Sequence, residues 1–259
     1  MAGMAAVWVL GGAQSDFARN LTREGAGLPE LTGEVLDATL ADAGVGAAAV
    51  EVIHVGNAFG QLFTGQGHLG AMPATVRPEL WGVPAARHEA ACASGSVAVL
   101  AAMADLRAGN YDCALVLGVE LERTVSGDAA AGHLGAAAWV GHEGQQAKFI
   151  WPHMFDRIAG EYDSRYGLDD AHLRAIAALN LANAKRNPNA QTRGWAVPEL
   201  ADLNDADANP VVDGRIRRYD CSQVTDGAAA VVLASDAFLR RHPELPARAR
   251  IDGWGHRTV

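Results

Sequence analysis

The sequence predicts an α/β fold with a helical insertion, and three observations support this. Strand and helix patterns alternate over residues 1–122, which predicts parallel strands joined by right-handed crossover connections. The alternation stops over residues 123–215 and returns in residues 216–259. We therefore expect one α/β domain made of residues 1–122 and 216–259, with residues 123–215 inserted as a loop domain.

The individual elements follow from apolar periodicity and from turn residues. Helices are expected where apolar residues recur every three or four positions, and strands where short apolar runs end in Gly, Asn or Asp. The expected strands cover residues 6–12, 51–59, 84–90, 111–122, 224–235 and 248–255. The expected helices cover residues 28–44, 66–82 (broken near Pro73 and Pro78), 94–110 and 169–187, with a short helix ending at Arg241.

Composition and charge exclude several classes of protein. Of the 259 residues, 49% are hydrophobic and 20% are charged, which is typical of a globular enzyme. The formal net charge is −9, and the longest basic run is Arg215–Arg218, so we expect no nucleic-acid partner. We also expect no membrane partner, because we find neither a run of 18 apolar residues nor a secretory leader pattern.

Three cysteines are too few and too scattered for a disulfide framework, so we expect a reducing, cytoplasmic location. Cys92 differs from Cys113 and Cys221 because it follows a short strand and opens an apolar helix. The N–H groups and the positive dipole end of a helix N-terminus stabilise a thiolate, which makes Cys92 a candidate nucleophile. A buried core cysteine is the alternative interpretation at this stage. His88 and Cys92 lack the spacing of a metal motif, so no metal site is expected.

Three sequence blocks resemble the thiolase family. The segment HEAACASGSVAVLAAMADLRAGNYDCALVLGVE is similar to the family's nucleophile segment, with Cys92 in a C-A-S-G turn. VIHVGNAFGQLFTGQGHLGA resembles the stretch before it, and DCSQVTDGAAAVVLAS resembles the family's later Asp-Gly-Ala signature. The blocks fall in the family's order, and the residues around Cys92 are most similar to those of the sterol-carrier-protein-type and archaeal-type acetyl-CoA acetyltransferases.

The resemblance implies the N-terminal half of a thiolase, with a five-stranded mixed sheet. It implies acyl transfer between 3-oxoacyl-CoA and acetyl-CoA through an acylated Cys92, with coenzyme A as substrate and no other cofactor. Ser222 matches a serine that contacts coenzyme A, while His153 and Met154 match a pair that lines the pantetheine channel. The sequence departs from the signature at Asp220 and Cys221, where the family has Asn and Ala.

The resemblance also shows what these residues lack. The family needs an oxyanion-hole segment, a Gly-His-Pro histidine and a second cysteine in a C-x-G turn, and none occurs here. We therefore expect a missing segment or a second chain to supply the C-terminal thiolase half. Two alternatives remain open: a thiolase-like C–C lyase or hydroxymethylglutaryl-type synthase, and a coenzyme A-binding scaffold subunit without activity.

A homo-oligomer, most simply a two-fold dimer, is expected from the strand before Cys92. Thiolases pair this strand with its symmetry mate, and residues 84–90 form a short segment without Gly. An exposed strand edge beside an active site needs a cover.

Overall fold

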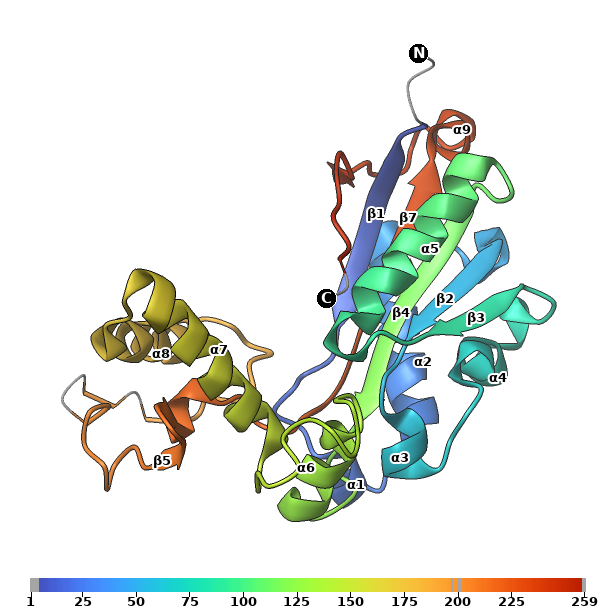
Figure 1. Ribbon diagram of the computed structural model, residues 1–259. Coiled ribbons are helices and arrows are strands. Elements are labelled where there is room, and N and C mark those ends of the chain that lie inside the picture. The colour runs from blue at the N-terminus through green and yellow to red at the C-terminus, as the bar shows by residue number, and fades with distance from the viewer. Residues whose placement is uncertain (1–4, 197, 200–201, 258–259) are drawn as a thin grey trace. The chain divides into compact units, whose positions relative to one another are not determined.

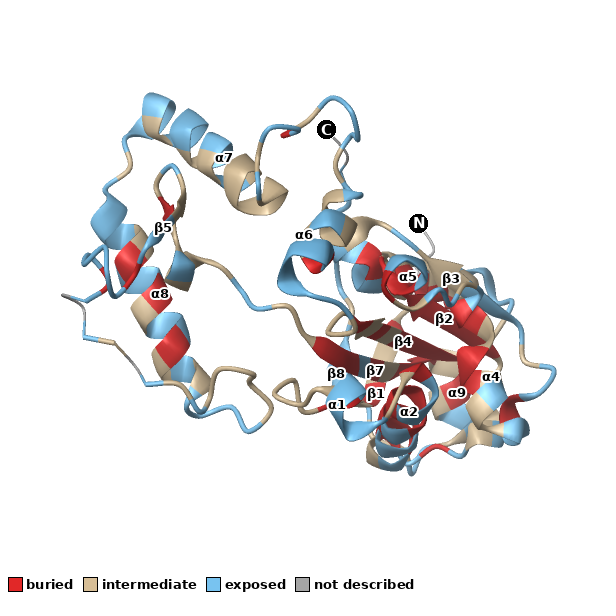
Figure 2. Ribbon diagram, turned by 90° about the horizontal axis from the view of Figure 1, so that it is seen from below, coloured by how far each residue is buried: buried red, intermediate tan, exposed pale blue. Residues whose placement is uncertain are grey.

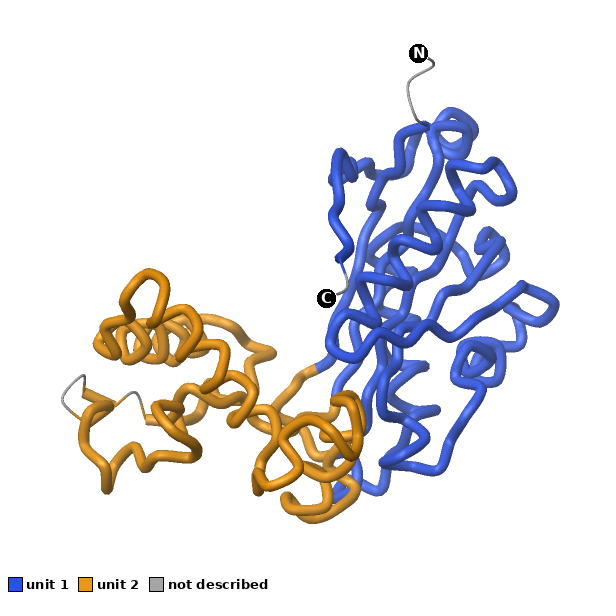
Figure 3. Tube along the Cα trace, viewed as in Figure 1, with its two compact units in different colours: residues 1–15, 21–121, 227–259 blue, residues 16–20, 122–226 orange. Residues whose placement is uncertain are grey.

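The computed structural model describes residues 5–196, 198–199 and 202–257. The chain forms two compact units, which Figure 3 shows in different colours. Unit 1 contains residues 1–15, 21–121 and 227–259, and unit 2 contains residues 16–20 and 122–226. The second boundary therefore lies at 226 and not at 215, because the hairpin around Gly214 and the turn after it pack on helices of unit 2.

Unit 1 is built on a six-stranded sheet in the order β3-β2-β4-β7-β1-β8. β2 is parallel to both β3 and β4, whereas β1 is antiparallel to β7 and β8. The mixed α/β sheet is confirmed, but five strands is wrong by one, because two residues of the last expected strand add to the edge of β1. The strands are β1 (Val7–Gln14), β2 (Val52–Gly56), β3 (Ala85–His88), β4 (Cys113–Leu121), β7 (Asp226–Ser235) and β8 (Ala249–Arg250).

One helix dominates each face of the sheet (Figure 1). On one face, α2 (Leu28–Ala43) buries Leu31, Val35 and Leu36 against alternate residues of the central strands. On the opposite face, α5 (Ser94–Ala108) buries a second, smaller cluster that includes Met103 and Leu106. Figure 2 shows the buried strands between these helices. Burial on both faces explains why β2 and β4 are mostly apolar, with His54 and Glu120 as the charged or titratable exceptions.

The ends of α2 and α5 follow from local chemistry. Pro29 lies in the first turn of α2, where its missing N–H costs no hydrogen bond. Gly44 and Gly109 close the two helices in the left-handed conformation, with φ values of 68° and 74°. Glycine adopts this conformation without the steric cost of a Cβ atom, so both helices end where the sequence predicts.

α5 approaches β2 unusually closely at one point. A Cβ atom placed on Gly56 would lie 2.8 Å from the backbone N and Cα of Gly95. The missing side chain of Gly56 lets the first turn of α5 rest directly on the end of β2. This contact fixes where α5 begins, at Ser94, two residues after Cys92.

Composition alone would allow the segment Ala91–Ala108 to span a membrane, and 28% of it is buried. The segment is not a run of 18 apolar residues, since it contains Asp105 and Arg107, but its alanines raise its mean hydropathy enough for a match by length and composition. In the structure the segment supplies a covering layer of the sheet, with Ala98 and Ala102 fully buried against it.

In its described residues, unit 2 contains three α-helices and a two-stranded hairpin. α8 (Asp170–Ala184) matches the expected helix, and the Asp169 side chain accepts the Ala171 N–H at its start. α6 (Gly127–Gly135), α7 (Ile150–Tyr166) and the hairpin of β5 (Val211–Asp213) with β6 (Ile216–Arg217) were not expected. The remaining helices and turns are α1 (Leu21–Glu24), α3 (Gly60–Thr64), α4 (Met72–Val76), α9 (Asp236–Arg241), η1 (Ala47–Ala49), η2 (Leu69–Ala71), η3 (Pro78–Leu80), η4 (Ala91–Ala93) and η5 (Arg218–Asp220).

The close contact between β2 and α5 predicts a specific sensitivity. Gly56→Ala should lower the free energy of unfolding by about 1–3 kcal/mol, because the added methyl group meets backbone atoms that cannot rotate away. Denaturant unfolding measures this. Gly95→Ala is the matched control, since a Cβ there meets nothing within 4 Å, and it should be neutral or stabilising. Equal unfolding midpoints for the two variants would contradict the packing argument.

Candidate active site

Cys92 is exposed and lies in η4, between the end of β3 and the start of α5. Ala91, immediately before it, has φ 48°, in the left-handed region that non-glycine residues rarely adopt. Such a conformation typically costs about 1–3 kcal/mol and persists only where neighbouring contacts enforce it. The turn that presents Cys92 is therefore defined by its surroundings.

Hydrogen bonds on both sides of Cys92 enforce this turn. The buried Ser94 hydroxyl accepts the Ala90 N–H at 2.9 Å and donates to the Ala91 carbonyl at 2.7 Å. A carboxylate oxygen of Glu89 accepts the Ala91 N–H at 2.6 Å. These three bonds tie together the backbone that precedes Cys92, so its thiol projects from a rigid support.

The helix after Cys92 begins without a side-chain cap. Ala93 occupies the N-cap position, and its side chain cannot accept a hydrogen bond. The first N–H groups of a 15-residue helix therefore have no side-chain acceptor at this end. A helix end of this kind attracts negative charge, which suits a residue that must react as an anion.

A polar junction joins the ends of the three parallel strands near this turn. Asn57, fully buried after β2, donates through Nδ2 to the Val119 carbonyl at 2.7 Å. Arg87 of β3 donates to the carbonyls of Asn57 and Ala58 at 3.0 and 2.9 Å. The loop after β2 is thus held from β4 and from β3, and the strand leading to Cys92 is fixed at its end.

Glu120 completes this junction from β4. Its carboxylate accepts the Ala58 N–H at 2.5 Å and lies 3.4 Å from the Phe59 N–H. Burial raises the pKa of Glu120, and these hydrogen bonds together with the charge of Arg87 oppose that shift. The sequence analysis did not identify Glu120 or Asn57, although both directly follow buried strand residues, where polar side chains are informative.

The other two cysteines have different surroundings. Cys113 is fully buried at the start of β4, and burial raises the pKa of its thiol to about 12, with smaller contributions from Glu51 and Asp112. Partial burial and the charge of Asp220 raise the pKa of Cys221. Neither thiol is suited to react as a thiolate near neutral pH.

The remaining predicted site residues belong to unit 2. His153 and Met154 are partly buried neighbours in α7, and His153 Nδ1 lies 3.3 Å from an Asp213 carboxylate oxygen. Ser222 is exposed in the loop after η5. The four predicted residues are thus divided between the units, and the roles of His153, Met154 and Ser222 stay predictions.

Unit 2 also contains a cavity of about 440 Å³. Its charged walls pair with each other: the Arg215 guanidinium is 2.7 Å from Asp163 and 3.4 Å from Asp170, and the Arg215 N–H donates to Asp156. None of the predicted site residues lines it. The lining residues are Asp156, Gly160, Asp170, Val211, Gly214, Arg215 and Arg217. Within residues 5–196, 198–199 and 202–257, no group of three or more His, Cys, Asp or Glu side chains could hold a metal ion.

Comparison with known proteins identifies the family. The profile described as "Thiolase, N-terminal domain" matches residues 7–193, which include the Cys92 turn. The chain belongs to the thiolase family. The resemblance inferred from the sequence blocks is therefore confirmed.

Curated relatives agree with this assignment. The chain is 29% identical to an acetyl-CoA acetyltransferase of Methanothermobacter thermautotrophicus, over 84% of this chain and 55% of the relative. It is 32% identical to an acetyl-CoA acetyltransferase of Methanocaldococcus jannaschii, over 74% and 46%, respectively. Sterol carrier protein 2 of Gallus gallus is 28% identical over 95% and 44%. The chain thus spans about half the length of these thiolase relatives.

Solved structures support the thiolase fold. Human mitochondrial 3-ketoacyl-CoA thiolase in complex with CoA superposes with a TM-score of 0.72 at 18% identity, over 96% of this chain and 69% of that chain. The Ltp2-ChsH2(DUF35) aldolase superposes with a TM-score of 0.70 at 22% identity, over 93% and 58%. At these identities the likeness concerns the fold alone.

The geometry predicts the order in which the three thiols react. Cys92 should be alkylated first by limiting iodoacetamide at neutral pH, because it is exposed while the thiols of Cys113 and Cys221 have raised pKa values. Peptide mapping by mass spectrometry measures the order. Unfolding in denaturant should remove the differences and serves as the control. Preferential labelling of Cys113 or Cys221 in the folded protein would contradict the assignment.

Proposed function

We propose that this thiolase-family chain takes part in acyl transfer between 3-oxoacyl-CoA and acetyl-CoA, with Cys92 as the covalent nucleophile. The exposed, rigidly supported Cys92 at an uncapped helix start is the observation that carries the proposal. The curated acetyl-CoA acetyltransferases support the reaction class.

The proposed reaction begins when a base removes the proton from Cys92. The sulfur attacks the 3-oxo carbon of the substrate, and the bond between C2 and C3 breaks. Its electron pair leaves with the acetyl-CoA fragment, which takes up a proton from an acid, while the shortened acyl group stays on sulfur as a thioester. A second coenzyme A thiol then attacks this thioester and regenerates Cys92. Developing negative charge on the thioester oxygen needs hydrogen-bond donors at both stages.

We assign coenzyme A contacts to Ser222, His153 and Met154 in unit 2. Ser222 offers an exposed hydroxyl, which can donate to a carbonyl or phosphate oxygen of the substrate. Met154 and the ring of His153 offer apolar surface to a pantetheine chain. Coenzyme A acts here as a substrate, and the proposal needs no separate cofactor.

The acid, the base and the oxyanion donors are proposed to come from a C-terminal thiolase half, in the same chain or in a partner chain. Support comes from the lengths compared above and from the three family motifs that these residues lack. The proposed setting is the cytoplasm, in agreement with three unpaired cysteines.

Carbon–carbon bond cleavage without acyl transfer to coenzyme A is the second candidate. The superposition on the Ltp2-ChsH2(DUF35) aldolase favours it, because that protein is an aldolase with a thiolase-like fold and a DUF35 partner. Product analysis separates the two: thiolysis yields two coenzyme A thioesters, whereas aldol cleavage yields a free carbonyl compound. A coenzyme A-binding scaffold without activity, the third possibility, would never carry an acyl group on Cys92.

The chain alone should catalyse negligible thiolysis of acetoacetyl-CoA. Adding a separately expressed C-terminal half of an archaeal acetyl-CoA acetyltransferase should raise the rate by about a thousandfold or more, since the missing groups act as a unit. Thioester absorbance measures the rate, and intact mass detects acetyl-Cys92. Cys92→Ser should abolish both, and Cys221→Ser is the matched control that should retain them. Full turnover by the chain alone would contradict the proposed division of labour.

We also propose a two-fold dimer formed through β3. β3 has a neighbour on one side only, and its Ala85 and Ala86 are exposed, so pairing with a second β3 would cover the open edge. Light scattering at tens of micromolar should give about twice the 27.1 kDa chain mass. Replacing Ala85 with Pro should favour the monomer, because the backbone groups of residue 85 face the open edge whereas those of residues 84 and 88 face β2, so the substitution removes a donor from the dimer pairing. A monodisperse wild-type monomer would refute the dimer.

A further inference from the structure

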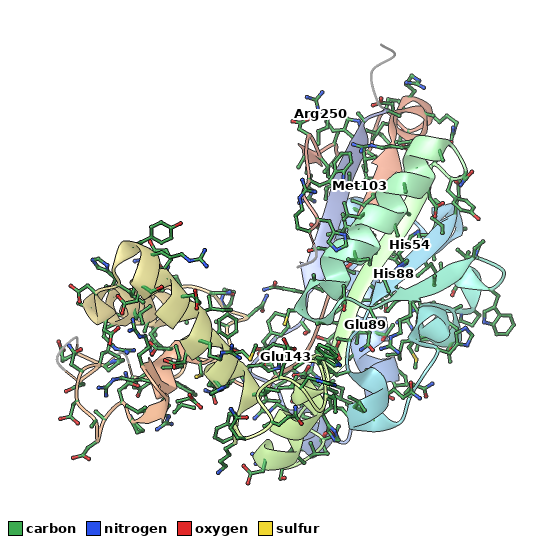
Figure 4. The ribbon with its side chains drawn as sticks, viewed as in Figure 1. His54, His88, Glu89, Met103, Glu143 and Arg250 are labelled. Atoms are coloured by element: carbon green, nitrogen blue, oxygen red, sulfur yellow. The ribbon has the colours of Figure 1, made fainter. Side chains whose placement is uncertain are left out.

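Three titratable side chains from β2, β3 and α5 meet in unit 1. His54 lies on β2 and is 5% exposed, His88 ends β3, and Asp105 lies on α5. His54 Nδ1 is 2.9 Å from His88 Nε2, and His54 Nε2 is 3.1 Å from an Asp105 carboxylate oxygen. Figure 4 shows the two histidines side by side below α5. The proposed acyl transfer uses none of these groups.

The distances determine how protons are arranged in this group. Two ring nitrogens 2.9 Å apart hold one proton between them. The Asp105 carboxylate favours a proton on His54 Nε2, which leaves His54 Nδ1 as the acceptor and His88 Nε2 as the donor. A first added proton can bind the outer nitrogen of His88 and leave this chain intact. A second must bind His54 Nδ1, and it then abolishes the contact and places two positive rings together.

Among the described residues, His88 and Asp105 are the two groups whose charges act on His54. In the register of the sheet, His54 lies opposite Ala86 on β3 and Val116 on β4, both uncharged. Asp105 also accepts a hydrogen bond from Asn110 at 3.2 Å. Burial and, after it, the charge of His88 lower the pKa of His54, while Asp105 opposes this shift; burial also lowers the pKa of His88, again against Asp105. Because lowered pKa values mean that the folded state binds fewer protons than the unfolded state, stability falls as the pH drops below about 6.5.

These residues contact the two elements that flank Cys92, namely β3 before it and α5 after it. β3 has four residues and, in the described sheet, pairs with β2 alone. Besides the two Arg87 hydrogen bonds described above, two contacts of His88 hold its end: the His88 carbonyl accepts the Asn57 N–H at 3.1 Å, and the His88 ring meets His54. α5 follows Cys92 and meets the same histidine through Asp105. His54 therefore connects the strand before the nucleophile to the helix after it.

We infer that His54 and Asp105 are positioning residues that hold His88, and through it the turn carrying Cys92. Double protonation of the histidine pair releases this turn. The inference rests on the proposed role of Cys92 as nucleophile. It adds a determinant of reactivity to that site, and it acts through residues that never touch the substrate.

The test measures the rate at which Cys92 reacts with iodoacetamide, which does not itself titrate between pH 4.5 and 8.5, in the 259-residue chain with Cys221→Ser and with peptide mapping of the product. The plot of log rate against pH should have unit slope while only the thiol ionises. Below about pH 6.5 it should steepen, as the pair takes up its second proton. His88→Gln can still donate to His54 but cannot titrate, so it should keep the wild-type rate at pH 8 and lose the steeper segment.

Three further variants sharpen the result. His88→Ala should lower the rate at pH 8 by about fivefold, the factor that loss of one hydrogen bond typically produces. Asp105→Asn should move the steeper segment to lower pH, because protonation loses its favourable partner. His172→Gln, at an exposed position on α8, should match the wild type. If His88 were merely structural, His88→Ala would have a lower unfolding temperature, but His88→Gln would keep the steeper segment that the wild type shows at low pH.

Several results would overturn the inference: unit slope throughout in the wild type, a steeper segment that persists in His88→Gln, or an upward shift in Asp105→Asn. If His88→Ala does not fold, His88→Gln and Asp105→Asn still test the inference. The reaction of the thiol needs no acyl transfer. Failure of the proposed function, seen as absence of acetyl-Cys92 with a C-terminal half present, is therefore distinguishable from failure of this inference.

Discussion

The contact between Gly56 and Gly95 is the constraint on which the arrangement around Cys92 depends. It brings the backbone of α5 against the end of β2, at a distance that any side chain at position 56 would prevent. The turn that joins β3 to α5 must then fit a fixed gap. Ala91 adopts a left-handed conformation within that gap, and Ser94 and Glu89 supply the hydrogen bonds that hold it. A strained backbone with matched hydrogen bonds has few alternative conformations, so the thiol of Cys92 is presented in one direction.

Much of unit 1 could be predicted from the sequence, because its elements are defined by local patterns. The alternation of apolar strands with helices, and glycines at positions 44 and 109, place most boundaries within a few residues. Cys92 could be identified for the same reason, since a cysteine between a strand and a small-residue helix is visible in one short segment. The length of the last strand could not be predicted: residues 248–255 were expected, but β8 contains only two of them and exists through its pairing with β1.

The elements missed by the sequence analysis depend on residues far apart along the chain. α7 has 17 residues and none of them is buried. Its Phe155, Ile158 and Tyr162 recur at helical spacing but stay exposed, so the apolar pattern of this helix has no counterpart in a packed core. Its described partners are polar: Asp156 accepts the Arg215 N–H, and Asp163 pairs with the Arg215 side chain, more than 50 residues later. The boundary at residue 226 was missed for the same reason, because the hairpin belongs with α7 through these contacts. Likewise, nothing local connects His54, His88 and Asp105 before the sheet is assembled.

The two faces of α5 differ in a way that explains how this helix serves two purposes. Its inner face buries Ala98, Ala102, Met103 and Leu106 against the sheet. After Cys92, its exposed residues are all small, namely Ala93, Gly95, Ser96, Ala104 and Ala108. Small side chains expose little apolar area, so the hydrophobic cost of leaving that face in water is low. The same small residues leave the thiol of Cys92 unobstructed, whereas larger ones would cover it. Access to the nucleophile and tolerance of an open helix face thus have one physical origin, the scarcity of large side chains at the start of α5.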